Sequence, residues 1–125
     1  MTKYPSFDRK SLTFSARRLE RGIHIHARFN APKLSSGEQG RYRQDITVDP
    51  ETRAVIGLST SYSRDGSRYL AAHGSGHDRL RLFATQIRDR FLKSPCWAAL
   101  KGRDPDPHYI VDQEGNVTVR QRSRD

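Results

Sequence analysis

The chain has 125 residues, which suits one compact domain that buries a core without disulfides or a structural metal. The single cysteine, Cys96, excludes an intramolecular disulfide framework, and no apolar stretch could span a bilayer, so we expect a cytoplasmic protein without membrane contact. The 23 lysines and arginines against 14 aspartates and glutamates give a net charge of +9, which favours polyanionic partners.

The first part of the chain predicts a lead-in followed by two strands. Residues 1–10 show no periodicity, so we expect a loosely ordered segment before a single domain at residues 11–119. Residues 11–17 and 22–30 both alternate apolar and polar side chains, which predicts a β-hairpin. In the second strand Ile23, Ile25, Ala27 and Phe29 form the apolar side, and His24, His26 and Arg28 form the polar side.

Two or three further strands are expected after a loop at residues 31–40. Residues 41–48 alternate again, with Tyr42, Ile46 and Val48 on one side and Arg41, Arg43 and Thr47 on the other. Residues 54–62 predict a fourth strand. Asp65 and Gly66 are typical of a two-residue hairpin turn, so residues 67–72 predict a short fifth strand.

The last third of the chain changes its periodicity. Apolar residues recur about every 3.6 positions over residues 77–93, which predicts one long amphipathic helix. Its apolar stripe comprises Leu80, Phe83, Ala84, Ile87 and Phe91, and its arginines, Arg79 included, are expected to lie mostly away from that stripe. Residues 96–100 predict a short second helix in which Cys96 packs inward. A hairpin follows over residues 109–119, and residues 120–125 are expected to be a disordered basic tail.

These elements together predict an α+β fold. We expect an antiparallel β-meander of four to five strands, with the long helix packed on its apolar face and a C-terminal β-hairpin. The opposite face of the sheet would then meet solvent. In fold alone, a curved antiparallel sheet followed by one helix is similar to several single-strand-binding folds, without any match of individual residues.

The polar face of this sheet is the candidate site. Guanidinium and hydroxyl groups are common donors to phosphate oxygens, and such contacts carry no sequence information. Tyr62 and Tyr69, near the predicted turn, are the candidate rings for stacking of bases. We predict no catalytic residue and no cofactor. The predicted nucleic-acid-binding residues are Arg17, His24, His26, Arg28, Arg41, Arg43, Arg120 and Arg122.

The leading hypothesis is a small, non-enzymatic protein that grips the phosphate backbone of DNA or RNA with low sequence specificity. An alternative is an accessory or inhibitory protein that docks on an acidic protein surface through the same arginines. A homodimer formed through an exposed strand edge is also left open. The same pattern fits a merely solvated sheet face, since polar outer faces are normal in antiparallel sheets.

A third hypothesis comes from the stretch Ile23-His24-Ile25-His26-Ala27. It resembles the hydrophobic-His-hydrophobic-His-hydrophobic motif of HUH nicking enzymes, and the resemblance covers only these residues. It implies that His24 and His26 bind a divalent metal in a metal-dependent nuclease with a tyrosine nucleophile. The predicted helix contains no tyrosine, so Tyr62, Tyr69 or Tyr109 would have to act from another element.

Overall fold

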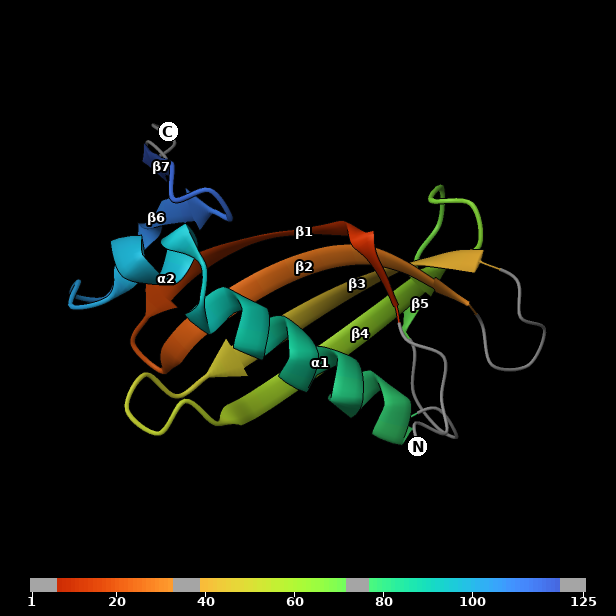
Figure 1. Cartoon of the computed structure of the whole chain (residues 1–125), viewed down its shortest axis with the longest axis horizontal. Helices are drawn as coiled ribbons and strands as arrows, with labels where there is room; N and C mark the ends of the chain where they lie inside the picture. Colours follow the sequence, from red (N-terminus) through yellow and green to blue (C-terminus); the bar gives the residue numbers. More distant parts are fainter. Residues whose placement is uncertain (1–6, 33–38, 72–76, 120–125) are drawn as a thin grey trace, which may run out of the picture.

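The computed structural model describes residues 7–32, 39–71 and 77–119. Within these ranges the chain forms one antiparallel sheet in the order β5-β4-β3-β2-β1-β6-β7, accompanied by two helices (Figure 1). The predicted α+β class with an antiparallel sheet is confirmed. The elements are β1 (Asp8–Leu19), β2 (Gly22–Pro32), β3 (Gln39–Val48), β4 (Val55–Ser63), β5 (Leu70–Ala71), α1 (His77–Leu92), α2 (Pro95–Leu100), β6 (Asp106–Asp112) and β7 (Val117–Val119).

The sheet is larger than the predicted meander of four to five strands. The C-terminal hairpin is not a separate unit, because β6 pairs with β1, placing Ala16 opposite Val111. This pairing joins the two ends of the described chain, and alternation along a strand does not reveal such a distant partner. Two helices are present, with slightly different bounds from those predicted: α1 ends at Leu92, and α2 begins at Pro95, whose ring suits the first turn of a new helix.

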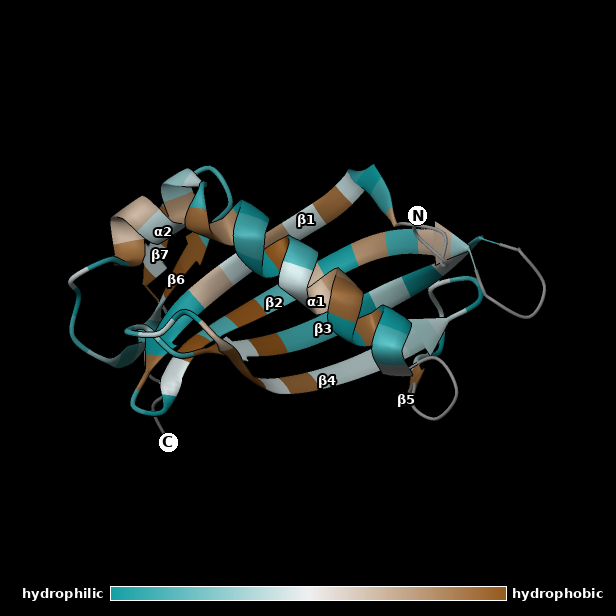
Figure 2. Ribbon diagram, turned by 60° about the horizontal axis from the view of Figure 1, so that its bottom comes forward, coloured by the Kyte–Doolittle hydropathy of each residue, from teal (hydrophilic) through white to brown (hydrophobic). Residues whose placement is uncertain are grey.

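The core lies between the sheet and the helices. All the apolar residues predicted for the inner side of β2 are buried, and bands of hydrophobic and hydrophilic residues alternate along the strands in Figure 2. Helix α1 packs on β3 and β4, and α2 packs on β1 and β6. Gly22 opens β2 with φ +142°, and a Cβ there would lie 2.7 Å from the Val48 carbonyl oxygen. Close approach of β2 and β3 therefore requires glycine at this position.

The apolar stripe of α1 is buried as predicted, but Arg79 departs from the prediction. Its side chain is 2% exposed, donates a hydrogen bond to the Pro32 carbonyl oxygen and lies 4.7 Å from the Phe83 ring centroid. A guanidinium is tolerated here because a backbone acceptor and an aromatic face receive it. The helical pattern alone does not identify these two partners.

The N-terminal boundary of the sheet lies inside the segment expected to be a lead-in. Strand β1 begins at Asp8, and Phe7 is buried, with its ring centroid 5.1 Å from that of Phe29 and 5.5 Å from that of Phe83. Residues 1–6 and the predicted tail at residues 120–125 lie outside the described residues. Among the described helices, none has the length and apolar character needed to cross a membrane.

Candidate nucleic-acid interface

Because α1 covers one side of the sheet, the side chains of opposite parity form a second surface, which we call the open face. Directly paired residues in an antiparallel ladder project to the same side, so the strand register identifies its members. They comprise Thr13, Ser15, Arg17, His24, His26, Arg28, Asn30, Arg41, Arg43, Asp45, Thr47, Ser59 and Ser61. All six predicted binding residues in the described part of the chain are therefore on one surface.

The most basic part of the open face is a row that crosses four strands. Arg28 on β2 lies opposite Arg43 on β3, and this pair is flanked by Thr13 on β1 and Ser61 on β4. Like charges placed directly opposite each other destabilise a sheet by about 0.2–1 kcal/mol. No carboxylate belongs to this row. The row is therefore a place where a bound anion would relieve a repulsion built into the sheet.

The segment between β4 and β5 lies against this arginine row. The Arg43 guanidinium carbon lies 3.6 Å from the centroid of the Tyr69 ring, in a cation–π contact. Gly66 packs against the Arg41 guanidinium, so a Cβ at this position would displace the arginine side chain. Tyr62, the other candidate ring, projects to the side of the sheet opposite the open face, and its ring centroid lies 5.0 Å from that of Tyr42. Of the two tyrosines, only Tyr69 is placed beside the arginines.

Next to the arginine row, two histidines share one carboxylate oxygen. His24 Nε2 lies 2.8 Å from Asp45 Oδ1, and His26 Nδ1 lies 2.9 Å from the same atom. Asp45 accepts both hydrogen bonds, so in their neutral forms His24 carries its proton on Nε2 and His26 carries its proton on Nδ1. His26 Nε2 is then an acceptor, and Arg28 Nε lies 3.5 Å from it. The carboxylate thus fixes the orientation of both rings.

The pKa of Asp45 is lowered from its ordinary value. Burial raises this pKa, but the hydrogen bonds and positive charge of His26 and His24 together outweigh the effect of burial. Asp45 is therefore ionised at neutral pH and introduces a negative charge among the basic groups. The carboxylate and both rings border a hollow of about 370 Å³ on the open face, which is also lined by Ser15, Arg17 and Ile110.

Among the described residues, no group of three or more His, Cys, Asp or Glu side chains is placed to hold a metal ion. His24 and His26, the candidate ligands from the HUH-like motif, each direct a ring nitrogen at Asp45 instead. Arg120 and Arg122, the remaining predicted binding residues, lie outside the described residues.

Asp45 is the main residue of this surface that the sequence analysis did not identify. Its position has the same parity as Arg41, Arg43 and Thr47, so alternation alone would have placed it on the open face. Its contact with His26 requires the register of β2 against β3, which places the two residues directly opposite each other. No protein-family model, curated protein or solved structure matches this chain. The function is therefore inferred from the chemistry of the open face.

Proposed function

We propose that the open face binds the phosphate backbone of nucleic acid with low sequence specificity. The observation that supports this most directly is the cross-strand pair of Arg28 and Arg43, which has no carboxylate in its row. Arg28 is exposed, as is Arg41 near the same end of the sheet. A phosphate between the guanidinium groups of Arg28 and Arg43 would accept charge-assisted hydrogen bonds from them and would offset their mutual repulsion.

The surrounding side chains support backbone binding more than recognition of bases. Hydroxyl donors lie along the arginine row and along the neighbouring row that contains His26; they belong to Thr13, Ser15, Ser59 and Ser61. Such groups contact phosphate and sugar oxygens in many complexes, and these contacts position a nucleic acid without reading its sequence. Tyr69 contributes an aromatic ring at the margin of the row, where an unpaired base could stack. The proposal therefore includes single-stranded DNA and RNA among the ligands.

The proposal is tested by measuring affinity as a function of salt. Fluorescein-labelled single-stranded RNA, single-stranded DNA and duplex DNA of equal length and mixed sequence are titrated with the protein, and anisotropy is recorded. Backbone contacts predict a linear fall of log Kobs with log salt concentration and similar affinities for unrelated sequences. Absence of binding at low salt would refute the proposal.

The rival function, docking on an acidic protein surface, uses the same arginines and is separated by a second measurement. Tagged protein is used to capture partners from a cell extract with and without nuclease treatment. Nucleic-acid binding predicts that most captured material is lost after nuclease. Retention of the same acidic proteins after nuclease would favour the docking function instead.

A further inference from the structure

Among the described strands, only the short β5 pairs with the outer edge of β4. Strand β5 pairs only with residues 61 and 62, so among the described strands nothing lies beside residues 55–60 on that edge (Figure 1). In an antiparallel strand, alternate residues direct their backbone N–H and C=O groups toward opposite neighbours. Part of the β4 backbone therefore presents donors and acceptors that another extended chain could pair with.

The composition of β4 does not protect this edge from pairing. Exposed edge strands usually carry charged residues or proline, which discourage the addition of another strand. Strand β4 contains neither, although 30% of the chain is charged and β1, β2 and β3 all contain arginine. One bulge at Ile56, between the pairs Val48–Val55 and Thr47–Gly57, interrupts the strand near its start. Residues 57–60 remain regular and available.

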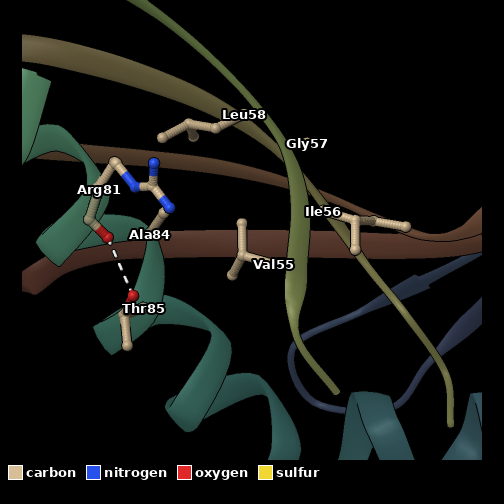
Figure 3. Close-up of a pocket in the computed structure, with 7 residues that line it drawn as sticks. All are labelled: Val55, Ile56, Gly57, Leu58, Arg81, Ala84 and Thr85. Atoms are coloured by element: carbon tan, nitrogen blue, oxygen red, sulfur yellow. Dashed lines mark hydrogen bonds between the residues drawn. The ribbon is translucent and has the colours of Figure 1, made fainter. Parts of the chain in front are cut away.

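A groove runs beside this edge, between β4 and α1. It encloses about 250 Å³ and has apolar walls that include Val55, Leu58 and Ala84. Figure 3 shows Val55 on the side of β4 that faces α1, whereas Ile56 points away from the helix. A strand added to β4 would project every second side chain toward the helix side, above this groove. The groove could therefore receive apolar side chains from the added strand.

Charge determines the kind of chain that fits. The Arg81 side chain reaches from α1 toward β4 (Figure 3), and within the described part of the chain it forms no ion pair. Arg88, about two turns further along α1, is already engaged by Asp89 at 2.9 Å and by the Arg53 carbonyl oxygen at 3.1 Å. Of the described residues that line the groove, Arg81 is thus the cation left to receive a carboxylate. A second copy would instead bring another chain of charge +9 to the same edge.

We propose that the β4 edge binds an extended acidic segment of a partner protein by strand addition. The segment pairs with the backbone of residues 57–60, places apolar side chains over Val55 and Leu58, and directs a carboxylate to Arg81. Backbone pairing provides affinity, and the groove and the arginine provide selectivity. This interaction surface uses the outer backbone edge and the helix side of β4, shares only Ser59 with the open face, and does not depend on nucleic-acid binding.

The proposal is tested with a fluorescein-labelled peptide of alternating valine and glutamate, compared with a peptide of alternating valine and lysine. We expect the glutamate peptide to bind about tenfold more tightly, and hydrogen exchange to slow at backbone amides within residues 57–60. The Arg81→Glu variant should lose most of the preference for the glutamate peptide. Arg90→Glu, an equal change of charge at another exposed position of α1, should leave the preference intact.

Four results would overturn the proposal. The first is that neither peptide binds, and the second is that both bind with equal affinity. The third is that Arg81→Glu and Arg90→Glu change the peptide preference equally. The fourth is that exchange at residues 57–60 is slow without peptide and that the protein dimerises as its concentration rises. The last result would assign the edge to a second copy of the chain. Circular dichroism of both variants establishes that they are folded before binding is compared.

Discussion

Replacing Arg28 and Arg43 together by glutamine perturbs the proposed function at its most basic point. These residues lie directly opposite each other on β2 and β3, and no carboxylate shares their row. Glutamine retains hydrogen-bonding capacity and removes the charge. The substitution removes the like-charge pair together with the Arg43–Tyr69 cation–π contact, and because these two effects oppose each other, we expect little net loss of stability. A change in nucleic-acid binding would then report the loss of phosphate contacts.

The size of the effect follows from the number of arginines on the open face. Four phosphate contacts result if each arginine of the open face binds one phosphate; these are Arg17, Arg28, Arg41 and Arg43. The plot of log Kobs against log salt concentration then has a slope of about −2.8 for single strands and about −3.6 for duplex DNA. Raising the salt from about 50 to 200 mM would then weaken binding about 50-fold and 150-fold, respectively. With two contacts removed, the slopes become about −1.4 for single strands and about −1.8 for duplex DNA, and the same rise in salt weakens binding about 7-fold and 12-fold, respectively.

The assay is fluorescence anisotropy at several salt concentrations, with wild type and variant measured side by side. The matched control is Arg53→Gln with Lys93→Gln, which removes the same charge from two exposed residues outside the open face. The control should lower affinity slightly through net charge and keep the wild-type slope. Equal slopes in all three proteins would refute the assignment of phosphate contacts to Arg28 and Arg43.

Four further predictions concern the carboxylate, the core and the thiol. Asp45→Asn should strengthen oligonucleotide binding about fivefold in the anisotropy assay, because it removes the negative charge beside the basic row. In denaturant titrations, wild type should be more stable than Asp45→Asn above about pH 5. This advantage should disappear as the pH falls through about 4 and below, because the lowered pKa of Asp45 stabilises the folded state only while the carboxylate is ionised. Phe83→Ala should lower the free energy of unfolding by about 3–5 kcal/mol, because the ring is fully buried; a loss below about 1 kcal/mol would contradict the packing. Burial raises the pKa of the Cys96 thiol to about 12, so a thiol reagent at pH 8 should label it only after unfolding, and rapid labelling of the native protein would contradict this position.

The sequence was most informative where a local period determines which side of an element is buried. Alternation in residues 22–30 separated Ile25 from His24 and His26 correctly, and the period of α1 identified Phe83 and Ile87 as core residues. Both predictions depend only on the directions of side chains along one strand or one helix. Such information is present within a short window of sequence.

The features that could not be predicted depend on distant partners. Pairing of β1 with β6 depends on how the chain closes around the core, and no residue of β1 encodes that neighbour locally. Arg79 is buried because the Pro32 carbonyl oxygen is within reach of its guanidinium. Asp45 meets His24 and His26 through the register between β2 and β3. In each case the decisive contact joins residues whose separation in sequence exceeds the window of a periodicity analysis.

The central claim is that nucleic acid binds the open face and not the side covered by α1. It is tested most directly by recording amide chemical shifts of isotope-labelled protein during titration with a short single-stranded oligonucleotide. Binding at the open face predicts that the largest shift changes cluster at Arg28, Arg43 and their neighbours across β1–β4, and that α1 changes little. Changes concentrated on α1, or spread evenly over the molecule, would contradict it.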